Sequence, residues 1–283
     1  MEFKEVNQLP IDVEKAIEKR VSTRSFEARS LSDEDKNNLM NFNKTLTNPF
    51  GIDVKVQYIS KDTGAKNVQL GTYGTIKGAK DFLAITVKDE PFAMEAVGYQ
   101  FENLVLYATH MNLSTVWLAA TFSRKDFENV MNIASDDLFP CICPIGYPAE
   151  KSSIIEKFTK VSLGSKNRKA WDKLFYLEDF NKPLSKYDAG DYAVALEMLR
   201  LAPSATNSQP WAVVKEGNNF HFFCDYKNNI NDGMKKIKHL DIGIALSHFH
   251  QTAMSKGLSG RFEVRDIYFS IPKNMHYIIS YIS

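Results

Sequence analysis

Apolar and polar residues recur along the chain with two different periods, and each period predicts a different element. Apolar residues at steps of three and four between Met94 and Met111 predict a long helix with one buried face. Alternation at Val54–Ile59 predicts a half-buried strand, and the continuous apolar run Phe82–Val87 predicts a central strand covered on both faces. Ser32, followed three residues later by Asp35, marks the start of a helix.

The order of elements repeats after residue 170. A buried strand at Cys141–Pro148 ends the first set, and the polar, lysine-rich stretch Glu150–Lys169 is interpreted as a connecting arm. The second set comprises a helix, two strands, a long helix and two closing strands, predicted at Asp188–Leu201, Trp211–Val214, Phe220–Cys224, Leu240–Lys256 and within 261–272 and 277–282.

The two long helices match at a constant separation of 145 positions, as in Gly98 and Gly243 (243 − 98 = 145). Asn112 then falls opposite Gly257, and either residue suits a left-handed helix end. The match predicts an α+β fold of two duplicated α/β/α units, residues 1–170 and 171–283. Such units would pack around a pseudo-twofold axis as the subunits of a homodimer do. The alternative is a chance match of one pair of helices.

Composition limits the class of protein. Of the 283 residues, 44% are hydrophobic and 24% are charged, which is typical of a globular chain. A formal net charge of +1 gives no field that would attract nucleic acid or an anionic membrane, so neither partner is expected. Cys141, Cys143 and Cys224 are interpreted as reduced thiols in or near the core. The N-terminal stretch lacks the apolar segment of a signal peptide, and we expect a cytoplasmic protein without a membrane span.

The stretch RVSTRSF places Arg20, Ser22 and Arg24 at alternate positions. In an extended segment alternate side chains point the same way, so two guanidinium groups and a hydroxyl could bind a phosphate. The alternative is a solvated cluster of surface charges. The stretch GTYGTIKGA, residues 71–79, is interpreted as either a turn or a cradle for a planar ligand.

No set of side chains points to catalysis by the protein itself. The six histidines show no H-x-x-x-H or H-E-x-x-H spacing, so no metal site is expected. The chain also lacks a G-x-S-x-G elbow, a G-x-G-x-x-G fingerprint and a Walker sequence. If the chain is an enzyme, a cofactor should carry the chemistry, and we name no catalytic side chain.

Three motifs in order, RVSTRSF, PIGYP and LAPSATNSQPW, resemble the FMN-dependent nitroreductase superfamily. GTYGTIKGAKDFLAI, NLSTVWLAATF and NRKAWDKLF are similar to its TM nitroreductase branch, in which two nitroreductase units are fused in one chain. The resemblance covers about Val13 to Ile279. It implies a nitroreductase-like fold, an FMN bound between the two units, and NAD(P)H as the electron donor.

The resemblance also implies which residues bind the cofactor. Arg20, Ser22 and Arg24 would take the ribityl phosphate, together with Lys166 and Arg168. Tyr73, Gly74 and Thr75 would lie along the pyrimidine edge of the flavin, and Pro203, Ser204, Ala205 and Asn207 would pack on the flavin from the other half. Ala119 and Ala120 stand where the family usually has a glycine-containing segment near flavin N5, so a methyl group is added where the backbone approaches the ring.

The halves carry different motifs. Thr45–Val56 stands where a first APS loop should fall, and Phe175–Gly190 lacks an R-x-S-x-R motif, so the two halves together predict a single FMN. We expect an FMN-dependent NAD(P)H oxidoreductase that reduces nitro, quinone or similar electron-poor small molecules, as a monomer or a weak homodimer. The alternatives are other flavin chemistry on this fold, such as dehalogenation or flavin turnover, and a non-catalytic flavin-binding or scaffold protein.

Overall fold

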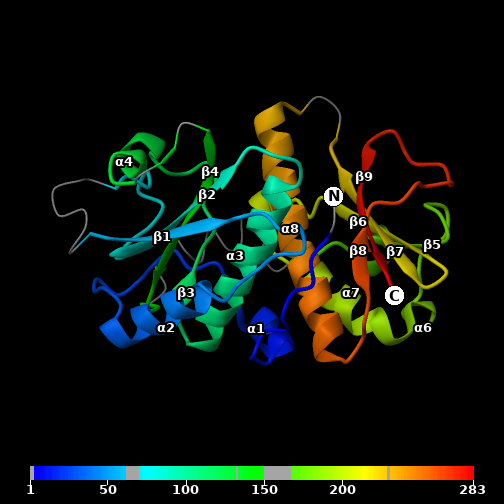
Figure 1. Cartoon of the computed structure of the whole chain (residues 1–283), viewed down its shortest axis with the longest axis horizontal. Helices are drawn as coiled ribbons and strands as arrows, with labels where there is room; N and C mark the ends of the chain where they lie inside the picture. The colour runs from blue at the N-terminus through cyan, green and yellow to red at the C-terminus, as the bar shows by residue number, and fades with distance from the viewer. Residues whose placement is uncertain (1–2, 62–69, 132, 135, 150–166, 228–229) are drawn as a thin grey trace.

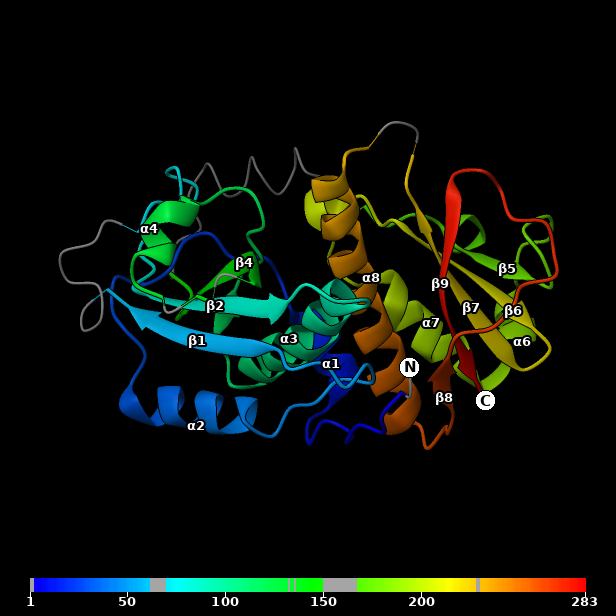
Figure 2. The same ribbon diagram turned by 45° about the horizontal axis from the view of Figure 1, so that its top comes forward.

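Two β-sheets lie at opposite ends of the molecule, and the two long helices α3 and α8 lie between them (Figure 1; Figure 2). The structure is a computed structural model and describes residues 3–61, 70–131, 133–134, 136–149, 167–227 and 230–283. The first sheet consists of β1 (Lys55–Ser60), β2 (Asp81–Lys88), β3 (Ser114–Thr115) and β4 (Asp137–Gly146). The second consists of β5 (Phe175–Leu177), β6 (Trp211–Glu216), β7 (Asn219–Asp225), β8 (Arg261–Glu263) and β9 (Met275–Ile282).

The two sheets repeat one strand order. The first runs β1-β2-β4-β3, and the second runs β6-β7-β9-β8 with every one of these neighbours antiparallel in both sheets. The second sheet has one more strand, β5, which pairs in parallel with the outer side of β6. The chain therefore has an α+β fold, and the repeated order is what a duplicated unit would give.

The long helices are α3 (Ala93–His110) and α8 (Asp232–Ser255), and both are buried over most of their length. Helix α8 begins eight residues before the predicted start, because its first two turns are polar and show no apolar stripe. Its true start is Asn231, whose side chain accepts from the Met234 N–H. The predicted left-handed helix ends are confirmed, with φ of 63° at Asn112 and 74° at Gly257. In the part of the chain that the structure describes, no helix combines the length and apolar character that crossing a bilayer requires.

The shorter helices are α1 (Val13–Lys19), α2 (Asp33–Asn43), α4 (Arg124–Glu128), α6 (Lys186–Ala189) and α7 (Ala193–Arg200). Ser32 caps α2 as predicted, since its side chain accepts from the Asp35 N–H at 3.1 Å. The single helix predicted at Asp188–Leu201 is wrong. Gly190, at φ 60° and ψ −140°, ends α6, and a 3₁₀ turn (Gly190–Tyr192) leads into α7. The three cysteines are unpaired and buried, as expected.

The N-terminal segment is anchored on both long helices. Val13, Ala16 and Ile17 of α1 pack in one cluster with Leu106 of α3. Ahead of α1, the Leu9 N–H donates to Oε1 of Gln251 in α8 at 2.9 Å. These contacts fix the residue that ends α1, Arg20, relative to both helices.

Helices α3 and α8 touch backbone to backbone at their matching glycines. A Cβ added to Gly98 would lie 2.1 Å from the Leu240 carbonyl oxygen, and one added to Gly243 would lie 2.1 Å from the Glu95 carbonyl oxygen. The two contacts are reciprocal, since 240 − 95 equals 243 − 98, or 145 positions. Only glycine permits this approach at either position.

Helix α8 also holds the loop that follows α7. The Ala205 N–H donates to Oδ1 of Asp241 at 3.0 Å. Burial raises the pKa of Asp241 to about 8, and among the described residues its other oxygen, Oδ2, has no hydrogen-bond partner. At neutral pH the carboxyl group is therefore largely protonated in the folded protein and ionised in the unfolded chain.

The helix crossing predicts a large effect of a single methyl group. We expect Gly98→Ala to lower the free energy of unfolding by about 3 kcal/mol or more, because the backbone of α8 must move away. Gly233→Ala, in the first turn of α8 where the added Cβ meets nothing closer than 3.4 Å, should change it by no more than about 1 kcal/mol. Urea denaturation of both variants measures this difference, and equal stabilities would refute the close crossing.

The raised pKa of Asp241 predicts that its contribution to the free energy of unfolding falls as pH rises. Its neutral form is favoured in the folded state, so the contribution is complete below the unfolded pKa of about 4 and is lost up to a pH of about 8. We expect Asp241→Asn to gain stability relative to wild type by about 1 kcal/mol per pH unit between pH 5 and 8. Asp53→Asn, at an exposed carboxylate, serves as the control in the same denaturation series. A pH-independent difference for Asp241→Asn would show that this carboxyl group is ionised in the folded protein.

Candidate functional site

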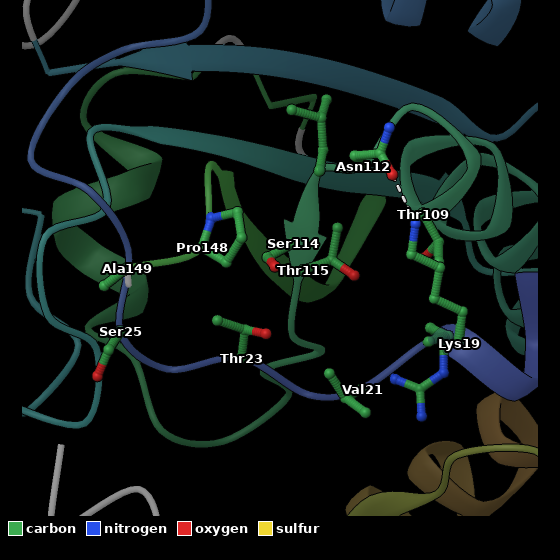
Figure 3. A pocket seen from close by; sticks show the side chains of 12 residues that line it. Lys19, Val21, Thr23, Ser25, Thr109, Asn112, Ser114, Thr115, Pro148 and Ala149 are labelled. Atoms are coloured by element: carbon green, nitrogen blue, oxygen red, sulfur yellow. Dashed lines mark hydrogen bonds between the residues drawn. The ribbon is translucent and has the colours of Figure 1, made fainter. Parts of the chain in front are cut away.

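An extended segment leaves α1 at Arg20 and runs beside β3. Ser22 forms a parallel bridge with Thr115, and the Thr23 N–H donates to the Thr115 carbonyl at 3.0 Å. The segment is therefore extended beside β3, as the sequence predicts. Lys19, Val21, Thr23 and Ser25 line a cavity of about 390 Å³ that Thr109, Asn112, Ser114, Thr115, Pro148 and Ala149 also line (Figure 3). Arg20 lies at the same cavity, whereas Ser22 and Arg24 are not among its lining residues.

Arg20 is a buried cation. Its side chain is 6% exposed, and its Nε lies 3.9 Å from Oε1 of Glu102, which is wholly buried in α3. Among the described residues, Nε has no hydrogen-bond partner. Burial lowers the pKa of Arg20, and the charge of Glu102 acts in the opposite direction. A guanidinium group so placed is suited to an anionic ligand that would complete its hydrogen bonds.

Arg168, which is distant from Arg20 in sequence, is a second partly buried cation near it. Its guanidinium group donates to Oδ1 of Asn207 and, at 2.9 Å, to the Leu201 carbonyl oxygen. Burial and then the positive charges of Arg20 and Arg200 lower the pKa of Arg168 to about 10. Arg168 thus contacts Asn207 and lies close enough to Arg20 for their charges to repel each other, although the three residues are far apart in sequence.

Among the described residues, the surroundings of Arg20 and Arg168 have an excess of positive charge. Arg200 is paired with Glu197, but the oxygens that accept from Arg168 are neutral, and Arg20 has one carboxylate at 3.9 Å. Like charges in a poorly solvated place repel each other strongly. A phosphate dianion would relieve this repulsion and bind both guanidinium groups, so the residues fit the phosphate end of FMN.

The loop after α7 has a strained backbone. Thr206, Asn207 and Gln209 have left-handed φ values of 52°, 55° and 46°, which residues other than glycine rarely adopt. Such strain persists only where neighbouring groups hold it, and it concentrates at functional sites. Pro203, Ser204 and Ala205 are half-buried at the start of this loop.

Gln209, which was not among the predicted site residues, holds the end of the loop, while Asp241 holds its start. Its N–H donates to Ser204 Oγ at 2.9 Å, and its Nε2 donates to the Asn207 carbonyl at 3.1 Å. Its Oε1 accepts from the Lys169 N–H at 2.7 Å, while Asn207 Nδ2 donates to the Asn167 carbonyl at 2.9 Å. The loop therefore clamps residues 167–169, which include Arg168. A glutamine two positions after the asparagine in the motif was the available signal.

The glycine-rich stretch forms a tight turn next to the arginine segment. The Thr75 N–H donates to the Thr72 carbonyl at 2.9 Å, and Tyr73, at φ 47°, is 70% exposed. Lys77, two residues after Thr75, donates its N–H to the Arg24 carbonyl at 2.8 Å. The turn that contains Tyr73, Gly74 and Thr75 is thus connected to the segment that contains Ser22 and Arg24.

Ala119 and Ala120 follow a fixed stretch of backbone. Leu118 exchanges both backbone hydrogen bonds with Ile142 of β4, at 2.9 and 3.0 Å. Ala119 is half-buried and its carbonyl accepts from Arg124 at 3.4 Å, whereas Ala120 is exposed. Just before them, the Trp117 indole N–H donates to Glu102 Oε2 at 2.8 Å. Of the predicted site residues, only Lys166 lies outside the described residues.

Two buried acids next to the predicted residues were missed. Glu102, in the middle of α3, connects Arg20 and Trp117, and Asp241 of α8 holds Ala205. Each is an acidic residue within the buried part of its helix. The sequence signal was Glu102 next to Phe101 on the apolar side of α3, and Asp241 between Leu240 and Ile242.

Comparison with solved structures shows the same fold. A nitroreductase from Thermotoga maritima MSB8 is 19% identical and superposes with a TM-score of 0.63, covering 96% of this chain and 94% of its own. A nitroreductase with bound FMN from Bacteroides fragilis NCTC 9343 is 14% identical, with a TM-score of 0.41, and covers 51% of this chain and 92% of its own. No curated protein matches the chain.

The family comparison covers most of the sequence. Residues 12–253 match the family model described as "Putative TM nitroreductase". The matched range includes the arginine segment, α3, all but the last two residues of α8, and the loop held by Gln209. The chain belongs to this nitroreductase family.

Proposed function

We propose that the chain is an FMN-dependent NAD(P)H oxidoreductase that reduces nitro, quinone or similar electron-poor small molecules. The observation that carries the proposal is that Arg168, which Asn207 holds, lies close enough to the buried Arg20 for their positive charges to repel each other. Membership of a nitroreductase family supports the same reading. When bound, the flavin would supply the hydride or electron transfer, and no side chain of the protein need act as an acid or base.

The protein would bind and orient the phosphate end of the cofactor. Arg20 and Arg168 each offer a guanidinium fork, with Ser22, Arg24 and Lys166 as further donors that the family resemblance implies. Asn207 keeps Arg168 in place, because its Oδ1 accepts from that guanidinium group. If both guanidinium groups are already held in place before FMN binds, binding loses less conformational entropy.

The flavin ring of the cofactor would contact the protein backbone. The Trp117–Ala120 stretch is held by the Leu118–Ile142 pair and by Arg124 on the Ala119 carbonyl. A backbone N–H of Ala119 or Ala120 would donate to flavin N5, with the alanine methyl group setting how closely the ring approaches. Tyr73, Gly74 and Thr75 would border the ring's pyrimidine edge, as the resemblance implies.

The site would be divided between two units of one chain. Arg20 belongs to the unit of the first sheet, and Asn207 belongs to a loop that leads into β6 of the second. The reciprocal glycine contacts and the repeated strand order support an internal pseudo-dimer. Because each half carries one side of the site, the chain would bind one FMN and function as a monomer.

Binding stoichiometry and two substitutions test the shared site. We expect one FMN per chain. Arg20→Ala should weaken binding about 100-fold because a phosphate charge loses its partner, and Asn207→Ala about tenfold because Arg168 is released. Arg29→Ala, at an exposed arginine paired with Glu27, is the control and should leave affinity unchanged. Fluorescence titration of FMN measures the dissociation constants. Two flavins per chain, or no effect of Asn207→Ala, would contradict the divided site.

Reduction of the bound flavin tests the reaction. Under anaerobic conditions NADH or NADPH should bleach the visible flavin absorbance, and a nitroaromatic compound or a quinone should then restore it. A protein that takes up no FMN would overturn the proposal. Bound flavin that neither nucleotide reduces would identify a flavin-binding protein without this activity.

A further inference from the structure

Glu102 is a wholly buried carboxylate that meets three side chains from three different segments. Its Oε1 lies 3.0 Å from His248 Nε2 in α8 and 3.9 Å from Arg20 Nε at the end of α1. Its Oε2 accepts from the Trp117 indole N–H at 2.8 Å. Glu102 and His248 both have 0% side-chain exposure, so water does not compete for these contacts.

The hydrogen bonds of His248 show where its protons lie. Its Nδ1 is 3.0 Å from the Met198 carbonyl oxygen, which can only accept, so Nδ1 carries a proton. A second proton must then lie between Nε2 and Glu102 Oε1. The pair is neutral as a whole, since the carboxylate charge and the shared proton cancel.

This neutral pair has its negative end toward Arg20. The carboxylate oxygen Oε1 lies 3.9 Å from Nε of the Arg20 guanidinium, and the same oxygen bonds the imidazole of His248 in α8. Arg168 repels Arg20, and Cys143 is the further titratable group that faces both Arg20 and Glu102. The field of a neutral pair decays quickly with distance. It therefore attracts Arg20 at close range and repels a phosphate beyond Arg20 only weakly.

A second acid on α3 offers a comparison within the same helix. Glu95, one heptad before Glu102, is also buried and pairs through Oε1 with Nδ1 of His239 in α8. His239 in turn bonds the Tyr226 hydroxyl. This pair has the same chemistry and links the same two helices, but Arg20 is not among its partners.

We propose that Glu102 is a positioning residue of the cofactor site. It holds the Arg20 guanidinium group toward the phosphate, against the repulsion of Arg168. His248 shares a proton with Glu102, and this proton neutralises the carboxylate. The inference rests on the proposed function, because it takes the phosphate of FMN as the ligand of Arg20. Glu102 acts through Arg20 and does not itself touch the cofactor.

The test compares Glu102→Gln with Glu95→Gln in the full chain. Glutamine keeps an oxygen for the Trp117 indole and an amide for His248, but it removes the carboxylate oxygen that forms the negative end of the pair beside Arg20. We expect Glu102→Gln to weaken FMN binding about tenfold and riboflavin binding less than twofold, because riboflavin lacks the phosphate. Glu95→Gln should leave both affinities unchanged. Thermal melting of the two variants measures any general loss of stability.

A double-mutant cycle with Arg20→Ala separates positioning from a structural role. In the Arg20→Ala background, Glu102→Gln should change FMN affinity by less than twofold, since the group it positions is gone. Equal losses for FMN and riboflavin, full additivity with Arg20→Ala, or unchanged FMN affinity of Glu102→Gln would each overturn the inference. If Arg20→Ala itself leaves FMN binding unchanged, the proposed phosphate site fails.

Discussion

The contact on which the rest of the structure depends is the crossing of α3 and α8 at Gly98 and Gly243. With no side chain at either position, each helix presses its backbone against a carbonyl of the other. This closeness brings side chains from the two helices within bonding distance along the whole interface. Glu102 reaches His248, Asn103 accepts from Ser247 at 2.7 Å, and Tyr99 reaches His250 at 2.8 Å. Wider spacing would leave these buried polar groups without partners, at a cost of about 1–3 kcal/mol each.

The crossing also determines where the candidate site forms. Helix α1 packs on α3 and ends at Arg20, while the loop after α7 is held by Asp241 of α8. The two helices thus carry the two sides of the site, and their contact fixes the relation between Arg20 and Asn207. Residues 167–169 lie between these sides, clamped by Gln209. Glu102, with Oε1 3.9 Å from Arg20 Nε, offsets part of the positive charge on the Arg20 side.

Much of the fold could be predicted because local rules decide it. The apolar run Phe82–Val87 became a strand with neighbours on both sides, and Ser32 capped its helix as its side-chain oxygen suggested. The start of α8 was missed because its first turns face solvent and leave no apolar pattern. Gly190 was missed as a helix end because a single glycine in a helical pattern does not by itself reveal the positive φ of 60° that ends α6 there. Among the residues of the candidate site, Arg20 and Asn207 could be predicted because they belong to sequence motifs. Glu102 and Asp241 could not, because their partners are decided by how α3 and α8 cross.

The position of Arg20 and Asn207 on one chain has a consequence for how the molecule behaves in the cell. Where two separate subunits build a site, dilution separates its halves, and the site exists only at concentrations above the dimer's dissociation constant. In the divided site that we propose, the peptide chain joins the two sides, so their encounter is intramolecular. The site would persist at any copy number, including a few molecules per cell.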